Sequence, residues 1–200
     1  MNFLDYTEKR FHCQQSGHCC VNPKIIVTLT YRDIFRLYMI QDYNFEKLLQ
    51  KISFYTLEES LVNIVREQMV LEPIQTSQGK IIPGLRKLKG GSCIFYNHPN
   101  CSIYSNRPLA CMNYPFTFIK EKDAIVSVWA KNALKSCPGI GKGPPISSEK
   151  IKRLGERLIE EIQLQNQVVE NLNIEALEGR PLTAREALWI FVIYGEKEKK

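Results

Sequence analysis

Seven cysteines are the residues of this 200-residue sequence whose type and spacing point most directly to chemistry. Three lie near the N-terminus and four follow after a gap of 72 residues: Cys13, Cys19, Cys20, Cys93, Cys101, Cys111 and Cys137. Thiolates are preferred ligands of zinc and of iron–sulfur clusters. The first three stand among Gln, Ser, Gly and His, which is not the setting of cysteines that fill a core. We therefore expect a metal-binding protein whose cofactor is an iron–sulfur cluster or a zinc ion.

Disulfide bonds are the main alternative use of these cysteines, and simple burial in the core is another. The odd number of cysteines opposes complete pairing. The first ten residues contain four charged side chains and no apolar stretch, so no secretory signal is expected. The longest apolar run, Leu188–Tyr194, is too short to span a membrane. We therefore expect a cytoplasmic protein without a membrane partner, in which the thiols stay reduced.

The adjacent pair Cys19-Cys20 bears on the number of metal sites. On an extended backbone, neighbouring side chains point to opposite sides, so these two thiolates would not easily serve one tetrahedral ion. The pair therefore favours two metal sites or one polynuclear centre. The C-x₂₋₄-C knuckles of structural zinc sites are absent, because the gaps within the two groups are five, seven, nine and 25 residues. This spacing leans slightly toward an iron–sulfur cluster, and zinc stays open.

The order of the motifs is similar to that of a known family. Residues 11–20, FHCQQSGHCC, resemble the F-x-C-x-x-C-G-x-C-C opening of the YkgJ-like cysteine-cluster family, a zinc- or iron-chelating domain. The later motifs agree in the same order: Cys93-Ile-Phe95, Cys101-Ser-Ile-Tyr104, Arg107-Pro108, Cys111 before Tyr114-Pro115-Phe116, and Cys137-Pro138-Gly139-Ile-Gly141. The resemblance implies that the seven cysteines are the metal ligands. It also implies an alternative, a protein-lysine N-methyltransferase-like enzyme, because flagellin lysine-N-methylases resemble the family in the cysteine motif.

One position departs from the family pattern. Ser16 stands where the family usually carries an eighth cysteine, and serine is a poor ligand for zinc or iron beside cysteine. Either one site has three thiolates, or another group completes it. The imidazole of His18 is the nearest substitute and suits both metals, and His12 and His98 are further candidates. A site with three protein ligands would instead keep an open position, as catalytic metal sites do.

Two other functions stand beside metal binding alone. The methyltransferase would be expected to carry a G-x-G-x-x-G fingerprint, but Gly139-Ile-Gly141-Lys-Gly143 is a glycine alternation in a turn-rich segment. Nucleic-acid binding is the other, because the net charge is +6 and Lys80–Gly143 holds ten basic residues against two acidic ones. The same cations also compensate an anionic thiolate site, so nucleic acid is not the partner we expect. The sequence identifies no protein partner.

These motifs need a scaffold, and the hydrophobic pattern predicts an α+β fold. We expect a cysteine-cluster domain over 1–146 and a helical C-terminal extension over 147–200. Short strands are predicted over Ile25–Leu29, Lys80–Leu88, Cys93–Tyr96, Phe116–Lys120 and Ala124–Ala130, and 138–145 is predicted as a Gly/Pro linker. The segment 53–62 fits no single class, and 61–71 fits a strand or a helix.

Capping residues mark the predicted helices. One helix is expected after Thr30, with Asp33 at its third position, and should end at Ile40. A second is expected after Asn44 and should end near Lys51. A single helical turn is expected over Pro108–Asn113, with the proline as its first residue.

The C-terminal helices carry similar signals. Ser147 or Ser148 caps a long helix with one apolar face: Ile151, Leu154, Leu158, Ile162, Val169 and Leu172. Thr183 and Glu186 form a capping box at the start of a last helix, which is expected to end at Gly195. Two family positions also receive local roles. Gly17 is expected to supply a positive φ in a tight ligand loop, and Arg107 to orient a helical turn or to face a thiolate or an acid.

Overall fold

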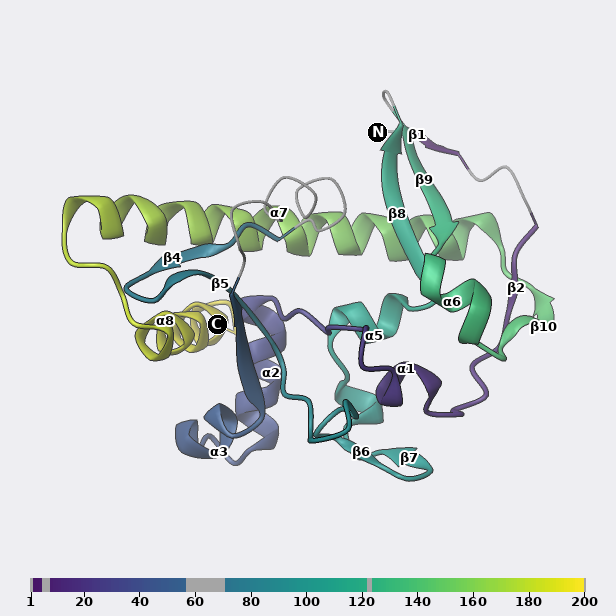
Figure 1. Ribbon diagram of the computed structural model, residues 1–200. Helices are drawn as coiled ribbons and strands as arrows, with labels where there is room; N and C mark the ends of the chain where they lie inside the picture. Colours follow the sequence, from purple (N-terminus) through teal and green to yellow (C-terminus); the bar gives the residue numbers. More distant parts are fainter. Residues whose placement is uncertain (1, 5–7, 57–70, 122–123, 200) are drawn as a thin grey trace.

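Helices and strands are interspersed along the chain, and the α+β prediction is confirmed (Figure 1). The structure, a computed structural model, describes residues 2–4, 8–56, 71–121 and 124–199. In that part of the chain the elements are β1 (Asn2–Leu4), β2 (Arg10–Phe11), α1 (His18–Val21), α2 (Tyr31–Ile40), α3 (Phe45–Leu49), β3 (Ile52–Thr56), β4 (Ile74–Thr76), β5 (Gly79–Leu85), β6 (Tyr96–Asn97), β7 (Asn100–Cys101), η1 (Tyr104–Asn106), α5 (Leu109–Asn113), β8 (Phe116–Glu121), β9 (Ala124–Trp129), α6 (Lys131–Ser136), β10 (Ile140–Pro145), α7 (Ser148–Glu178) and α8 (Ala184–Lys197).

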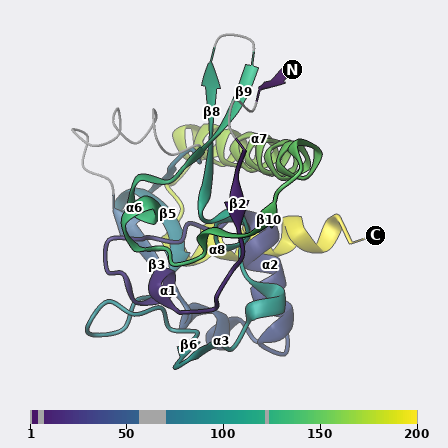
Figure 2. The same cartoon turned by 90° about the vertical axis from the view of Figure 1, so that its right-hand side faces the viewer.

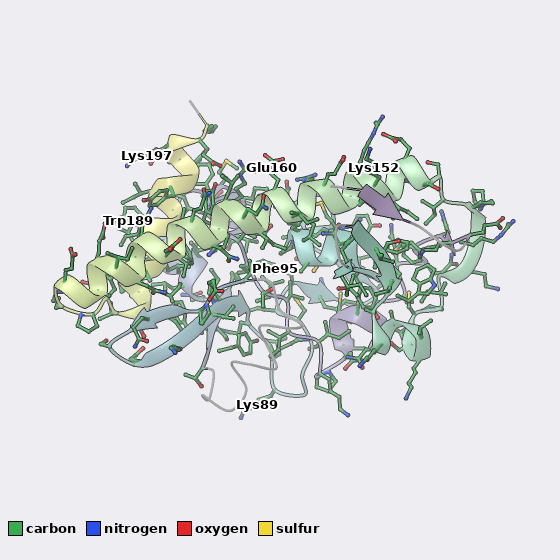
Figure 3. All side chains as sticks on the ribbon, turned by 90° about the horizontal axis from the view of Figure 1, so that it is seen from above. Lys89, Phe95, Lys152, Glu160, Trp189 and Lys197 are labelled. Carbon is green, nitrogen blue, oxygen red and sulfur yellow. The ribbon has the colours of Figure 1, made fainter. Side chains whose placement is uncertain are left out.

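Helix α7 runs along one side of the molecule and is seen lengthwise from above in Figure 3. Its predicted cap is confirmed, because the Ser147 hydroxyl accepts a hydrogen bond from the backbone N–H of Lys150 at 3.3 Å. The predicted apolar face turns inward. Its buried residues are Ile151, Ile162, Val169 and Leu172, and its half-buried residues are Leu154 and Leu158. Charged residues such as Lys152 and Glu160 are exposed, so amphipathic patterning explains the helix.

Helix α8 begins at the predicted capping box and extends past its predicted end. Thr183 Oγ1 accepts from the Glu186 N–H, and the Glu186 carboxylate accepts from the Thr183 N–H. We expected the helix to end at Gly195, but it continues to Lys197. The reason is packing, because a Cβ at Gly195 would lie 2.3 Å from Cβ of Phe35. Gly195 therefore allows α2 and α8 to pack closely and does not end the helix.

Helices α2, α7 and α8 surround one hydrophobic core, and Figure 2 shows them from the side. The predicted cap of α2 is confirmed by a capping box between Thr30 and Asp33. The core includes residues of both predicted segments, from Leu29 and Ile34 to Val169 and Phe191. The domain boundary predicted at 146/147 therefore remains a prediction, because residues on both sides of it contribute to the same core.

The sheet of β3, β5 and β4 is antiparallel throughout and lies beside α7 and α8 in Figure 1. The predicted strand Lys80–Leu88 corresponds to β5. The predicted strand Ile25–Leu29 is not a regular strand, since Thr28 forms a single bridge with Gly84. This segment still runs along β5, because the N–H of Leu29 donates to the Pro83 carbonyl at 3.0 Å.

A second sheet contains β8 and β9 as an antiparallel hairpin, as predicted, with β1 parallel to β9. The predicted linker 138–145 is wrong, because Ile140–Pro145 pairs with β2. The predicted strand Cys93–Tyr96 is also wrong, because only Tyr96 belongs to a strand. Cys93 instead begins a turn, in which its carbonyl accepts from the N–H of Tyr96 at 2.9 Å. The first error concerns a pairing across more than a hundred residues, and the second a local turn that replaces the start of the strand.

Two sequence expectations fall partly outside the described residues. The segment 53–62, for which no single class is predicted, begins in β3, and its residues from 57 onward lie outside the described part. Of the segment 61–71, only residue 71 is described.

Helices α2 and α3 begin at their predicted caps, and α3 ends at Leu49, two residues before Lys51. Among the helices that the structure describes, none has the length and apolar character needed to cross a membrane.

Candidate metal centre

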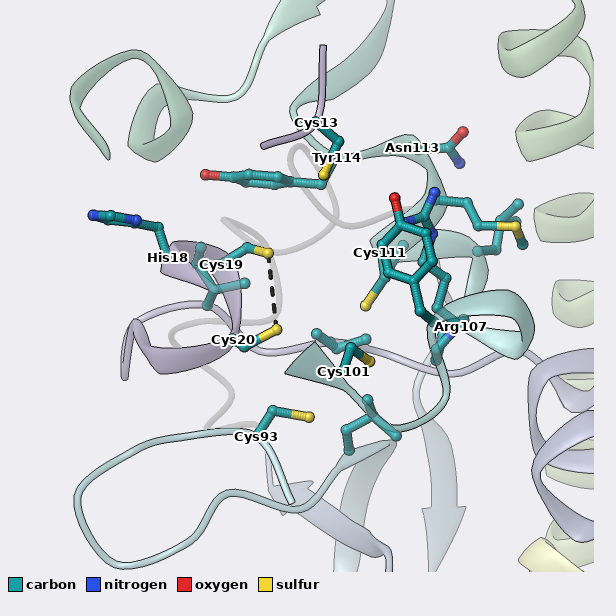
Figure 4. Close-up of a pocket in the computed structure, with 18 of the residues that line it drawn as sticks. Cys13, His18, Cys19, Cys20, Cys93, Cys101, Arg107, Cys111, Asn113 and Tyr114 are labelled. Atoms are coloured by element: carbon teal, nitrogen blue, oxygen red, sulfur yellow. Dashed lines mark hydrogen bonds between the residues drawn. The ribbon is translucent and has the colours of Figure 1, made fainter. Parts of the chain in front are cut away.

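All seven cysteines line one pocket with a volume of about 640 Å³. They reach it from five places in the fold: the loop before α1, α1 itself, the turn and hairpin around β6 and β7, α5, and the C-terminal end of α6. Figure 4 shows the thiols of Cys19, Cys20 and Cys111 directed into the same space. The two cysteine groups, separated by 72 residues of sequence, therefore meet in one place.

Helix α1 places the thiols of Cys19 and Cys20. Gly17 precedes it with a φ of 73°, which confirms the predicted positive φ, and its carbonyl accepts from the Cys20 N–H at 2.8 Å. The sulfur atoms of Cys19 and Cys20 lie 4.0 Å apart. We reasoned from an extended backbone, on which these side chains would diverge, and that premise is wrong because the pair occupies a helical turn. Their adjacency therefore no longer argues for two separate sites.

A direct backbone hydrogen bond joins the two cysteine groups. The N–H of Cys93 donates to the carbonyl of Cys20 at 2.8 Å. The ammonium group of Lys87 donates to the carbonyl of Asn22 at 3.0 Å, just beyond α1. These bonds hold α1 against the turn that carries Cys93. The hairpin then follows, with Cys101 paired to Tyr96 across β6 and β7.

Cys111 is held by α5, whose start is fixed from a distant helix. The N–H of Leu109 donates to the Asp33 carboxylate at 3.0 Å, and Asp33 is 1% exposed. The same carboxylate caps α2 and forms an ion pair with Arg36. Proline was expected as the first residue of this turn, but Pro108 is its N-cap. The long-range role of Asp33 was missed, because its sequence signal is only that of a local helix cap.

Cys137, the seventh cysteine, directly follows α6, and its backbone N–H donates to the carbonyl of Ala133 at 2.8 Å. Strand β2 approaches here, because the N–H of His12 donates to the carbonyl of Gly139 at 3.1 Å. A Cβ at Gly139 would lie 2.4 Å from the His12 carbonyl oxygen, so glycine permits the approach. This contact brings the exposed Cys13 to the side of the pocket where Cys137 lies.

The proposed replacements for the eighth cysteine are less well placed than the thiols. Ser16 and His18 line the pocket and are exposed, and the ring of His18 points away from the labelled thiols in Figure 4. The ring of His98 shares a hydrogen bond with the hydroxyl of Tyr96 at 2.9 Å. His12 is exposed beside Gly143. A ligand role for His18 stays a prediction that requires its ring to turn.

The thiols influence one another's protonation. The thiol of Cys20 hydrogen-bonds to Cys19 and, with help from backbone N–H groups and the Arg107 charge, lowers the pKa of Cys19 to about 6 despite burial. The same hydrogen bond raises the pKa of Cys20. Burial, together with the charge of Cys19, raises the pKa of Cys111 and of Cys137. Of these four thiols, Cys19 is thus the one that ionises most easily, and its charge contributes to the raised pKa of the other three.

The donor set fits a thiolate-bound metal, although the side chains do not yet have the geometry of one. Among the described residues, no three Cys, His, Asp or Glu side chains are close enough together to hold an ion as they stand. The sulfur separation of 4.0 Å between Cys19 and Cys20 is near the ~3.8 Å that two thiolates on one tetrahedral zinc would have at 2.3 Å bonds. Small side-chain movements within the pocket would therefore suffice for this pair.

The comparison with known proteins agrees with the motif order. Residues 12–135, more than half of the chain, match a family model, and the matched region stops just before Cys137. No curated protein and no solved structure gives a significant match. With its cysteines around one pocket and their motifs in the family order, this chain belongs to the CxxCxxCC family, described as "Putative zinc- or iron-chelating domain".

Proposed function

We propose that this chain is a metal-binding protein whose seven cysteines hold an iron–sulfur cluster or a zinc centre. One observation carries this: thiols from both groups line the same pocket, as in Figure 4. Seven cysteines that merely filled a core would have no reason to gather there. We place the protein in the cytoplasm, where its seven free thiols would remain reduced.

The metal would join parts of the fold that are distant in sequence. Cys13 and Cys19 belong to the N-terminal loop and α1, and Cys111 and Cys137 to α5 and the end of α6. Binding energy at such a site adds to folding energy. The metal would therefore serve a structural role, and the same thiolates would also suit electron transfer or metal handling.

Metal analysis with an absorption spectrum, on protein purified without oxygen, distinguishes the cofactors. Iron, sulfide and a broad thiolate-to-iron absorption band would identify a cluster. Stoichiometric zinc in a colourless solution would identify a zinc centre. Protein that is folded but binds neither metal on reconstitution would refute the proposed function.

Two variants test individual ligands. Cys19→Ala and Cys111→Ala should each lower metal affinity by at least the ~10–100-fold that losing an outer-shell partner costs, and should lower the melting temperature too. Val168→Ala is the matched control, because Val168 of α7 is 7% exposed and belongs to the hydrophobic core. The variant loses packing without losing a thiol. It should be less stable and keep its metal. If a cysteine variant keeps full metal content, that cysteine is not a ligand.

A further inference from the structure

The pocket extends past the thiols toward α7. On that side it is lined by Asn113, by Met112 and by two residues of α7, Leu158 and Ile162. Figure 4 shows Asn113 and Arg107 on the α7 side, with the thiols of Cys19 and Cys20 on the opposite side. A metal held by the thiols would therefore leave this part of the pocket to another occupant.

Asn113 is the most unusual residue of this side. Its side chain is 4% exposed, and neither its amide nitrogen nor its amide oxygen has a hydrogen-bond partner. The large majority of buried side-chain polar atoms in native proteins are paired. Both polar atoms are covered, and Figure 4 shows the amide directed away from the labelled thiols, so a ligand would have to draw the amide out of the pocket wall. There it would offer one donor group and one acceptor.

Arg107 provides a positive charge in the same pocket. Its guanidinium group stacks on the ring of Tyr104, with 4.1 Å from Cζ to the ring centroid. Within the described ranges, no carboxylate forms an ion pair with Arg107. Stacking covers a face of the guanidinium and leaves its N–H edge available, and that edge matches a carboxylate with two parallel hydrogen bonds.

The remaining walls on this side decide what kind of anion fits. Met112, Leu158 and Ile162 are apolar, and Arg107 supplies one positive charge. The pocket also contains the Asp33 carboxylate, which is held by Arg36 and by the Leu109 N–H and disfavours a second negative charge on the ligand. A phosphate carries up to two charges and usually requires more donors, whereas a monoanionic carboxylate on an organic body suits one arginine and apolar walls. We propose that the pocket binds a small organic carboxylate, held by Arg107 and Asn113 with its apolar part against α7. This second ligand goes beyond the metal centre.

The experiment uses the full chain loaded with its metal. Butyrate, succinate, glutarate and benzoate are titrated at constant ionic strength, and butyramide serves as the neutral analogue of butyrate. At least one carboxylate should raise the melting temperature in a saturable manner, with binding confirmed by calorimetry, and butyramide should not. If none of the four carboxylates binds more strongly than chloride, the second ligand is refuted.

Variants locate the site. Arg107→Gln and Asn113→Leu should each weaken carboxylate binding about tenfold or more, as expected for losing a contact worth ~1.4 kcal/mol. Lys89→Gln is the control, because it removes a charge from an exposed residue outside the pocket lining and should bind as the original protein does. Asn113→Leu keeps the size of the side chain and removes only the amide. Unchanged binding by Asn113→Leu would overturn the site.

Metal content measured on every sample separates this ligand from the metal centre. A carboxylate bound by protein that takes up no metal would refute the proposed function and support the second ligand. Full metal with no carboxylate binding would do the reverse. If Arg107→Gln loses its metal, Arg107 serves the thiolates, and Asn113→Leu alone then decides whether the carboxylate site exists.

Discussion

Replacing Gly139 with alanine tests how the N-terminal loop is held against the Cys137 loop. The added Cβ would lie 2.4 Å from the carbonyl oxygen of His12, and the nearest ordinary contact is 3.4 Å, so the two backbones must separate by 1.0 Å (3.4 − 2.4). The hydrogen bond from the His12 N–H to the Gly139 carbonyl, now 3.1 Å, would be strained or lost. Cys13 would then move away from Cys137.

The expected size of this effect follows from the packing. Overpacking of this kind costs about 1–3 kcal/mol, and each 1 kcal/mol lowers the melting temperature of a protein of this size by roughly 2–4 °C. We therefore expect Gly139→Ala to melt about 2–12 °C lower and to bind metal more weakly. Circular dichroism during heating and metal content per chain measure the two effects.

Gly179→Ala is the matched control. Its added Cβ would lie 3.4 Å from the carbonyl oxygen of Glu175, an ordinary contact at the end of α7. This variant should melt near the original temperature and keep its metal. If Gly139→Ala also behaved in this way, the close approach of β2 to the Cys137 loop would not be a feature of the protein.

Two further perturbations test the supports of the site. Asp33→Ala should destabilise the protein by about 3–5 kcal/mol in urea, because it breaks a buried ion pair and the bond to Leu109. Glu156→Ala, which removes an exposed ion pair on α7, should cost under about 1 kcal/mol, and equal costs would contradict a role for Asp33 in holding α5. Hydrogen bonds from Arg180 above all lower the pKa of Glu186 to about 2, so its stabilising effect is present above its ordinary pKa and is lost as the pH falls through 2. The difference in melting temperature between the protein and Glu186→Gln should therefore shrink from pH 6 to pH 2. A difference that stays constant would contradict the lowered pKa of Glu186.

Local signals predicted the helices well. Thr30 and Thr183 each start a helix with a capping box, and a capping box involves only residues three positions apart. The end of α8 was harder to predict, because Gly195 is a helix breaker by propensity and is retained as a contact with Phe35. Tertiary packing decided a position that local sequence could not.

A pairing between distant segments accounts for the wrong linker prediction. Strand β10 pairs with β2, more than a hundred residues away, and a Gly/Pro-rich segment gives no local sign of such a partner. The motif order identified the seven cysteines and their family, because it depends on residue types alone. It did not contain the helical turn that brings the sulfur atoms of Cys19 and Cys20 to 4.0 Å. Nor did it indicate that Asn113 is buried and unpaired in the same pocket.

The way the cysteines are held bears on what happens when metal is lost. The segments of Cys93, Cys111 and Cys137 are each fixed by hydrogen bonds that involve no thiol: Cys93 N–H to the Cys20 carbonyl, Leu109 N–H to Asp33, and His12 N–H to the Gly139 carbonyl. The hydrophobic core reaches the thiols, since it includes Cys93 and contacts Cys20, Cys101 and Cys111, but much of it lies among α2, α7 and α8. Protein without metal should therefore keep its helices and melt at a lower temperature. A fully unfolded metal-free chain would mean that the metal organises the pocket, and that these bonds follow from it.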